Sequence, residues 1–298
     1  MKNIDFAVIG GSYAGMSAAL QLARGRRNVL VVDAGQRRNR FVDVAGETAH
    51  GFLTQDGHAP AEIAAIAKQQ LLAYPTVQWL DGTADDARAA ASGRIEFKAG
   101  NEVISAGRLI IATGVRDVLP PVPGLAERWG RSVFHCPYCH GYELNNGPVG
   151  IIAASPLALH HAVMLPDWGR TTLFLNGAYT PNGSELKAIA RRGTQIEPAL
   201  IERIDGVADV VLQGGRTYKM NGLFTQPHTL MSSLIAQQLG CAIDESPMGV
   251  FIKVDEAKAT SVPHVFACGD AARSAGNVAL AVADGAVAAF SAHRSAMV

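Results

Sequence analysis

The sequence predicts an α/β fold built from two strand–turn–helix units, and three observations support this prediction. An apolar run at residues 6–9 leads into a glycine-rich turn, and a helical pattern follows to about residue 24. A second apolar run, at 149–152, starts a similar unit later in the chain. The 298 residues, 48% of them hydrophobic, are enough for two domains of ordinary size. We therefore expect two α/β domains.

The composition excludes several classes of protein. The 26 basic and 26 acidic residues cancel, so no general affinity for nucleic acid or an anionic membrane is expected. No apolar run approaches the ~20 residues of a membrane span, and no apolar signal region precedes the first strand. The four cysteines, two of them in one CxxC, do not suit a disulfide-rich secreted domain. We expect a cytoplasmic protein.

The first unit has the pattern of a dinucleotide-binding turn. Gly10 permits a tight turn, Gly15 lets the helix pack closely on the strand, and a pyrophosphate would rest on the helix N-terminus. The strand at 29–32 ends in Asp33, at the distance expected of an acid that binds ribose hydroxyls. Ser12 replaces the usual middle glycine, which alters the approach of the backbone to phosphate. The alternative is a plain turn between strand and helix.

Two polar segments follow. The basic run at 36–40 predicts either a solvated loop or a contact with the adenosine half of a dinucleotide. The loop at 50–57 is polar and bounded by glycines, as loops that line a cofactor often are.

Regular elements resume after these loops. Apolar spacing at 59–72 predicts a helix. Alternation over 93–112 predicts a hairpin that turns at residues 100–101 and ends in a strand at 109–111. Three prolines between 115 and 124 predict a stiff link between domains.

The next segment, 135–143, contains a CxxC. Two cysteines at this spacing can close and reopen a small disulfide ring, and a positive neighbour or helix N-terminus makes one thiol a thiolate near neutral pH. The histidine that follows, His140, can carry a proton near physiological pH. The alternatives are a zinc site or an inert disulfide. Zinc would require a second ligand pair, whereas Cys241 and Cys268 stand alone in apolar surroundings, so we expect no metal.

The second unit keeps the pattern of the fold but not of the turn. The residues at 153–158 have lost glycine at two of three special positions, and Pro156 has no amide to offer a phosphate. The strand at 171–175 ends in Asn-Gly, without an acid for ribose or an arginine cluster for a 2′-phosphate. We therefore expect that the second unit has lost the residues that bind a dinucleotide.

The C-terminal part predicts one more strand, at 265–268, and an alanine-rich helix at about 277–291. Gly269 and Asp270 lie between them. A helix N-terminus aimed at a flavin can stabilise negative charge on the reduced ring. The alternative is that Asp270 is an ordinary surface acid.

Taken in this order, these motifs resemble the low-molecular-weight thioredoxin reductases of the pyridine nucleotide–disulfide oxidoreductase superfamily, over essentially the whole chain. The Cys-Pro-Tyr-Cys-His-Gly-Tyr-Glu segment is similar to that of flavin-dependent dithiol oxidases of the gliotoxin-forming type. The resemblance implies two Rossmann-like domains, one inserted into the other. An FAD-binding domain would comprise 1–116 and 245–298, and an inserted NAD(P)H-binding-like domain, 117–244, would carry the CxxC.

The resemblance also implies roles for residues. Cys139 would lie against the flavin and Cys136 would exchange with substrate, while His140 stands where the reductases carry an acid. Asp270 would bind the ribityl–phosphate side of FAD. The residues that would contact FAD are Gly10, Ser12, Ala14, Gly15, Asp33, Ala112, Thr113, Gly114, Gly269 and Asp270. A homodimer is implied as well.

We therefore expect an FAD-dependent thiol–disulfide oxidoreductase. The favoured direction is oxidation of a small dithiol, with oxygen as the acceptor. In the alternative, a donor reduces FAD, which reduces the CxxC and then a disulfide partner such as a thioredoxin-like protein. NADPH is the family's donor but is doubtful here, and a ferredoxin or another flavoprotein could replace it. A second alternative is a flavin-bound redox sensor. The sequence does not name the substrate.

Overall fold

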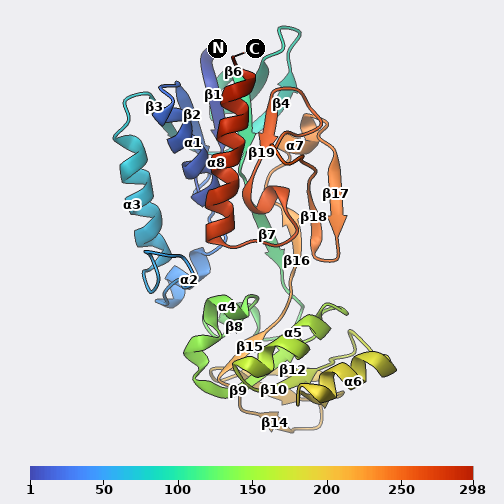
Figure 1. Ribbon diagram of the computed structural model, residues 1–298. Coiled ribbons are helices and arrows are strands. Elements are labelled where there is room, and N and C mark those ends of the chain that lie inside the picture. The colour runs from blue at the N-terminus through green and yellow to red at the C-terminus, as the bar shows by residue number, and fades with distance from the viewer. Residues whose placement is uncertain (298) are drawn as a thin grey trace. The chain divides into compact units, whose positions relative to one another are not determined.

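The computed structural model describes residues 1–297, which form two compact units (Figure 1). Unit 1 comprises Met1–Arg40, Pro60–Arg116 and the residues from Thr229 onward, and unit 2 comprises Phe41–Ala59 and Asp117–His228. The predicted α/β fold, with one unit inserted into the other, is confirmed. The chain returns to unit 1 at Thr229, whereas we had placed this boundary at 245, and the loop 41–59 belongs to unit 2.

Unit 1 is built on a seven-stranded sheet in which β6 is the branch point. The parallel part runs β3-β2-β1-β6, and β19 also pairs with β6 in parallel. The hairpin β4-β5 continues the sheet in antiparallel fashion. The strands are β1 (Lys2–Ile9), β2 (Val29–Asp33), β3 (Val77–Asp81), β4 (Ala84–Ala89), β5 (Ile95–Ala99), β6 (Glu102–Ile111) and β19 (Val265–Ala267).

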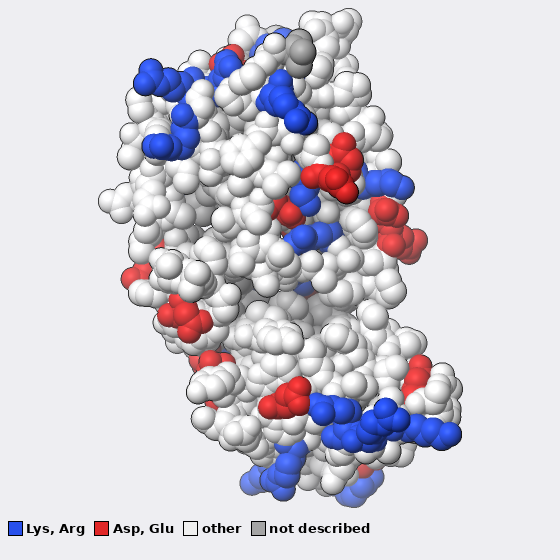
Figure 2. Space-filling view, in the orientation of Figure 1, with Lys and Arg blue, Asp and Glu red and all other residues white. Residues whose placement is uncertain are grey.

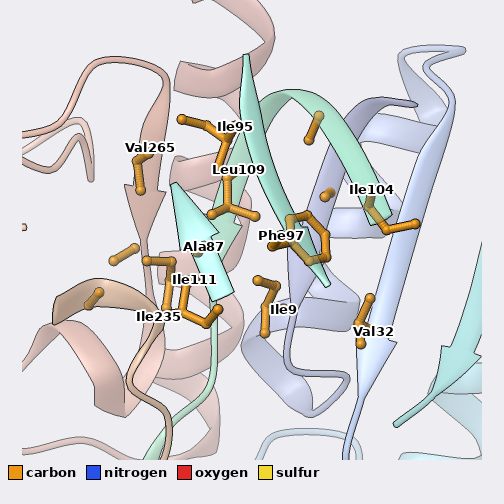
Figure 3. Packing of buried hydrophobic residues seen from close by; sticks show 14 of the residues in the cluster. Ile9, Val32, Ala87, Ile95, Phe97, Ile104, Leu109, Ile111, Ile235 and Val265 are labelled. Carbon is orange, nitrogen blue, oxygen red and sulfur yellow. The ribbon is translucent and has the colours of Figure 1, made fainter. Parts of the chain in front are cut away.

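Both faces of this sheet are covered, which explains why its central strands are almost continuously apolar. In β1, Val8 faces a core cluster with α1 (Tyr13–Arg24), α3 (Pro60–Leu72) and α8 (Val278–Ser295). The next residue, Ile9, faces the opposite cluster, which includes α7 (Ile235–Gln238). Figure 3 shows this second cluster, where Ile9 lies between Ile111 and Val32 and close to Phe97.

A smaller four-stranded sheet runs in the order β17-β18-β16-β7. Its strands are β7 (Val115–Val118), β16 (His228–Met231), β17 (Ile243–Ser246) and β18 (Gly249–Ile252). The proline-rich segment at 115–124 is therefore not only a stiff link, because its first four residues pair as a strand. The prolines begin only at Pro120, so the preceding amides are free to pair.

Unit 2 contains a five-stranded parallel sheet in the order β11-β10-β9-β15-β8 and a three-stranded antiparallel sheet, β12-β13-β14. Its strands are β8 (Val133–Phe134), β9 (Asn146–Ile152), β10 (Gly169–Phe174), β11 (Gln195–Glu197), β12 (Ile201–Asp205), β13 (Asp209–Leu212), β14 (Thr217–Tyr218) and β15 (Gly222–Phe224). Its helices are α4 (Pro137–His140), α5 (Ala158–Met164) and α6 (Gly183–Arg191), and α2 (Arg40–Ala45) begins at the boundary of the units.

Although the net charge is zero, charged side chains gather in local patches on the surface. Figure 2 shows both signs of charge on one face of the molecule, with Lys and Arg side chains gathered over α6. That helix contributes Lys187 and Arg191. Among residues 1–297, no helix combines the length and the apolar character that crossing a membrane requires.

The contact between α1 and α8 leaves no room for a side chain at Gly285. A Cβ built there would lie 2.1 Å from the carbonyl oxygen of Ala14, a backbone atom that cannot rotate away. We expect Gly285→Ala to lower the free energy of unfolding, because overpacking typically costs about 1–3 kcal/mol and outweighs the gain of up to ~1 kcal/mol in helix propensity. Gly183→Ala in α6, where a Cβ meets nothing within 4 Å, is the matched control. Equal urea-unfolding midpoints for the two variants would contradict this packing.

Candidate functional site

The turn after β1 is a close crossing of backbone segments. Gly10 has a φ of 106°, and a Cβ there would lie 2.2 Å from the carbonyl oxygen of Ala112. A Cβ at Gly15 would lie 1.8 Å from the carbonyl oxygen of Gly10. Since neither position admits a side chain, the chain can pass tightly from β1 into α1 beside the end of β6.

The start of α1 is open to an anion. Ser12 is the N-cap of this helix of 12 residues, yet its side chain makes no capping hydrogen bond. The N–H groups of the first turn therefore keep their capacity to bind a ligand, and the positive end of the helix dipole favours a phosphate there.

Asp33 lies at the end of β2 and fixes the same turn. Its Oδ1 accepts a hydrogen bond of 3.1 Å from the backbone N–H of Gly11. A Cβ at Gly11 would lie 2.4 Å from the ring of Trp79 and 2.7 Å from the Cβ of Asp33. We had not predicted Gly11 or Trp79 as part of the site. The only signal for Gly11 in the sequence was the pair of adjacent glycines, and such a pair is equally typical of a flexible turn.

The C-terminal segment reaches the same edge of the sheet. The N–H of Cys268 donates to the carbonyl oxygen of Ile111, 3.0 Å away. Gly269 follows with a φ of 66°, and a Cβ there would lie 2.8 Å from the Cβ of Ala14. A Cβ at Gly10 would lie 3.0 Å from the backbone nitrogen of Thr113, and Gly114 has a φ of 64°. The predicted residues of unit 1 therefore converge at the carboxyl end of its strands.

Asp270 is not an unpaired surface acid. Its Oδ2 lies 2.9 Å from Nη1 of Arg38, and both side chains are about one-fifth exposed (21% and 20%). Arg38 comes from the basic run at 36–40. At least this arginine therefore does not fit the interpretation of the run as a solvated loop. Its neighbour Asn39 donates to the hydroxyl of Tyr13 at 3.1 Å, while the Oδ1 of Asn39 is buried without a hydrogen-bond partner.

This part of unit 1 fits a bound dinucleotide. The glycine crossings bring the backbone within reach of a phosphate, and Asp33 supplies a carboxylate at the end of β2. The orphaned Oδ1 of Asn39 is an acceptor whose burial costs roughly 1–3 kcal/mol unless a donor pairs with it. A ligand with hydroxyl or amide donors would satisfy it.

The CxxC lies in unit 2, at the start of α4 and shortly after β8. Cys136 and Cys139 form a disulfide, with their Cα atoms 5.3 Å apart. Cys136 is the N-cap of α4, and Pro137 occupies the first helical position, where its missing N–H is no loss. Tyr138, between the cysteines, is 74% exposed. The motif is therefore an oxidised pair at the surface of this unit.

His140 packs more deeply than its sequence position suggests. Its ring stacks on Phe134 with centroids 4.3 Å apart and planes at 18°. Burial, and secondarily the nearby His50, lower the pKa of His140 to about 4. We expected this side chain to carry a proton near neutral pH. That expectation is wrong, because burial against an aromatic ring disfavours the charged form.

The loop 50–57 contributes His50 to the surroundings of the motif. The Nε2 of His50 lies 3.5 Å from Oε1 of Glu143 and 2.9 Å from the hydroxyl of Thr48. Its Nδ1 lies 3.6 Å from Oδ2 of Asp56, and the backbone N–H of Gly51 lowers the pKa of that carboxyl. We had assigned this loop to a cofactor, not to the CxxC, because its partner in unit 2 is remote in sequence.

The second strand–turn–helix unit uses its polar groups internally. The Oγ of Ser155 accepts from the N–H of Leu157 at 3.3 Å, and α5 starts only at Ala158. At the end of β10, Oδ1 of Asn176 accepts from the N–H of Ile201 at 2.9 Å. Both side-chain oxygens therefore already accept a hydrogen bond within unit 2.

The other two cysteines belong to the cores. Cys241 is 6% exposed and Cys268 is 0% exposed, and both are free thiols. Burial raises the pKa of Cys268 to about 12, so it stays a thiol at neutral pH. The prediction that these residues are core positions is confirmed.

Acid should destabilise unit 2 through two histidines. Burial lowers the pKa of His140 and of His161, which is 1% exposed, from 6.5 to about 4. The unfolded chain therefore binds more protons between pH 6.5 and 4, so stability present above pH 6.5 is lost as the pH falls. At pH 5 we expect a loss on the order of 2 kcal/mol per histidine. Urea unfolding at pH 7 and 5 should show a weaker pH dependence for His140→Asn than for wild type, and an unchanged one for the exposed His228→Asn. Identical dependence in all three proteins would contradict the assignment.

Comparisons with known proteins agree with this arrangement. The family described as pyridine nucleotide-disulphide oxidoreductase matches residues 4–285. "Thioredoxin reductase tcpT" of Claviceps purpurea (strain 20.1) is 32% identical over 301 residues, covering 96% of this chain and 92% of the relative. "Thioredoxin reductase sirT" of Leptosphaeria maculans is 31% identical over 307 residues, covering 94% and 90%.

A solved structure extends the similarity to three dimensions. The crystal structure of an oxidoreductase from Agrobacterium tumefaciens is 53% identical, with a TM-score of 0.95, and the match covers 100% of this chain and 99% of that chain. Since the family match spans nearly the whole sequence, the chain belongs to the pyridine nucleotide-disulphide oxidoreductase family, as a thioredoxin reductase-like enzyme.

Proposed function

We propose that this enzyme binds FAD in unit 1 and passes electrons between the flavin and the Cys136–Cys139 disulfide, oxidising a small dithiol with oxygen as the final acceptor. The observation that carries the proposal is the disulfide-bonded CxxC at the start of α4. The other unit has a set of residues that fits a dinucleotide, here called the cradle: the glycine turn after β1, Asp33 at the end of β2, residues 112–114 and residues 269–270. FAD, when bound, supplies two-electron transfer between a thiolate and oxygen. A homodimer and a cytoplasmic location belong to the same proposal and rest on the family resemblance.

The thiol chemistry runs through the two sulfurs in order. A substrate thiolate attacks Sγ of Cys136, which forms a mixed disulfide, breaks the Cys136–Cys139 bond and leaves Cys139 as a thiolate. The second substrate thiolate then attacks the substrate sulfur of the mixed disulfide, which releases a substrate disulfide and the Cys136 thiolate. Two thiols have lost two electrons and two protons, and the CxxC now holds the electron pair for the flavin. Cys139 is the sulfur assigned to the flavin side.

His140 has the role of proton acceptor beside this exchange. With a pKa of about 4 it is neutral at pH 7 and offers a lone pair to an incoming thiol. The same low pKa means that the proton cannot stay on the ring. The proton therefore passes on to solvent.

The cofactor contacts follow from the cradle. Ser12, Ala14 and Gly15 at the start of α1 would hold the pyrophosphate, and Asp33 would hold the adenosine ribose. Asp270 would contact the ribityl–phosphate side, with Arg38 as its fixed partner. The remaining cradle positions are Gly10, Ala112, Thr113, Gly114 and Gly269.

NADPH has weak support as the electron donor. The turn at 153–158 has no glycine, and the side chains of Ser155 and Asn176 already accept hydrogen bonds from backbone N–H groups of other residues in unit 2. The runner-up function is nevertheless a disulfide reductase acting on a thioredoxin-like partner, since the names of the curated relatives describe thioredoxin reductases.

Anaerobic mixing tests the direction of electron flow. We expect the FAD-loaded protein to be bleached by dithiothreitol and reoxidised by air, and to be reduced by NADPH slowly or not at all. Stopped-flow absorbance of the flavin is the measurement. The Cys136→Ser variant, in which the disulfide cannot form, is the control and should not be bleached by the dithiol. Reduction of wild type by NADPH at ~10 per second, a typical enzyme turnover, would contradict the oxidase and favour the reductase.

A further inference from the structure

Asp284 is a charged residue inside unit 1 that the proposed function does not use. It lies in the second turn of α8, and its side chain is only 8% exposed. The helix residues on either side of it, Ala281 and Ala288, pack with the apolar core. A carboxylate in such surroundings is costly unless cations pair with it. Its ion pairs therefore indicate why the position holds an acid.

Two cations meet Asp284 from two different segments. The Nζ of Lys258 lies 2.7 Å from its Oδ1, and the Nε of Arg273 lies 3.2 Å from its Oδ2. The two cationic side chains are 16% and 23% exposed, so water and salt screen these ion pairs only weakly. Lys258 precedes β19, and Arg273 directly follows the short helix η4 (Gly269–Ala272). Asp284 thus ties the segments before and after β19 to α8.

The backbone of Lys258 is held in a rare conformation at this place. Its φ is 62°, in the left-handed region that side chains other than those of glycine, asparagine and aspartate seldom adopt. Its carbonyl oxygen accepts a hydrogen bond of 3.0 Å from the N–H of Ala267 in β19. Such a conformation persists only where the surrounding structure fixes it. The ion pair with Asp284 and the bond to β19 are two contacts that do so.

The part of α8 that carries Asp284 packs directly on the cradle. A Cβ at the next residue, Gly285, would lie 2.1 Å from the carbonyl oxygen of Ala14. One turn earlier, the Cβ of Ala281 would lie 3.9 Å from a Cβ built at Gly269, which would itself be 2.8 Å from the Cβ of Ala14. Asp284 therefore lies on the helical turn that contacts both the start of α1 and the segment after β19.

That segment, 269–276, folds back tightly on itself. A Cβ at Gly276 would lie 2.6 Å from Oδ1 of Asp270 and 3.0 Å from Cδ of Arg273. Asp270 and Arg273 therefore pack around the same glycine, and a shift of one side chain displaces the other. The second carboxylate oxygen of Asp270 lies 2.9 Å from Nη1 of Arg38. The segment is thus held at two points, by Arg38 at Asp270 and by Asp284 at Arg273.

The three charged residues Lys258, Arg273 and Asp284, here called the Asp284 cluster, keep a net positive charge, because two cations share one carboxylate. Among the residues that the structure describes, Nε and Nη1 of Arg273 have no hydrogen-bond partner although they are buried, and the same holds for Oδ2 of Asp284. The close approach of Nε to Oδ2 is therefore an ion pair without an aligned hydrogen bond. An excess of positive charge beside the cradle favours an anionic ligand in it.

We propose that Asp284 is a positioning residue for the FAD site: its carboxylate ties Lys258 and Arg273, and through Arg273 it holds segment 269–276 in the shape that lets Asp270 receive the ribityl–phosphate side of the cofactor. Asp284 acts through its two cations. This inference rests on the proposed binding of FAD in unit 1 and is independent of the direction of electron flow.

Trypsin tests the anchoring of the segment in the full chain stripped of FAD, because Arg273 is itself a cleavage site. Asp284→Asn keeps the shape of the side chain and removes its charge. We expect this variant to be cut after Arg273 about tenfold faster than wild type, the effect of losing a contact worth about 1.4 kcal/mol. The masses of the fragments identify the bond that is cut, and their time course gives the rate.

The affinity for FAD tests the consequence for the cradle. We expect Asp284→Asn to raise the dissociation constant of FAD about tenfold, measured by quenching of flavin fluorescence on titration of the stripped protein. Lys258→Met should act in the same direction. The double variant should bind FAD no more weakly than the weaker single variant, because both substitutions break one contact. Strictly additive losses would contradict an action of Asp284 through Lys258.

Glu197→Gln in unit 2 is the matched control. The Glu197 side chain is 5% exposed and lies 2.9 Å from Nη1 of Arg216, so the variant also breaks a carboxylate–cation pair of a buried acid, but far from the cradle in the fold of the other unit. It should lower the unfolding midpoint and leave both the cut after Arg273 and the FAD affinity unchanged.

The outcomes separate this inference from the proposed function. Wild-type cleavage and wild-type FAD affinity in Asp284→Asn, or an equal loss of affinity in Glu197→Gln, would overturn the role of Asp284 while FAD binding stands. Where Asp284→Asn does not fold, Lys258→Met carries both measurements with the same expectation. A wild-type protein that never binds FAD would overturn the proposed function and this inference together.

Discussion

The crossing of β1, β6 and α1 is the constraint on which the rest of unit 1 depends. At Gly10 and Gly15 the backbone segments approach so closely that no Cβ fits between them. This contact sets where α1 begins, and Asp33 then secures the turn through the N–H of Gly11. Gly269 lies against Ala14 at the same place, which brings Asp270 to the edge of the sheet where the cradle opens. A larger residue at any of these positions would move the elements that form the cradle.

Unit 2 is under a different constraint, because it must hold a redox disulfide in a fixed position and also leave it accessible to substrate. Pro137 starts α4 directly after Cys136, and the exposed Tyr138 leaves this side of the motif open. The buried side is filled by Phe134, which contacts Phe224 and on which the ring of His140 stacks. Neutral imidazoles suit this position because they fill apolar space and still offer hydrogen-bonding nitrogens.

The local patterns in the sequence predicted the elements well. The apolar runs of β1 and β2, the glycine turn, the hairpin before Ile111 and the C-terminal helix are confirmed, since each is encoded by neighbouring residues. The pairing of Arg38 with Asp270 and of His50 with Glu143 was not predictable, because these partners are far apart in the chain. The lowered pKa of His140 was missed for the same reason, since it depends on burial against Phe134 and on a loop remote in sequence.

The central claim, that Cys139 exchanges electrons with FAD, is tested most directly by the absorption spectra of two single-cysteine variants. In FAD-loaded Cys136→Ser, the remaining Cys139 thiolate should lie beside oxidised flavin and give a broad charge-transfer band at wavelengths beyond the flavin absorption. Cys139→Ser should lack this band, although its Cys136 can still trap a substrate thiol as a mixed disulfide. Indistinguishable long-wavelength spectra for the two variants would contradict the account.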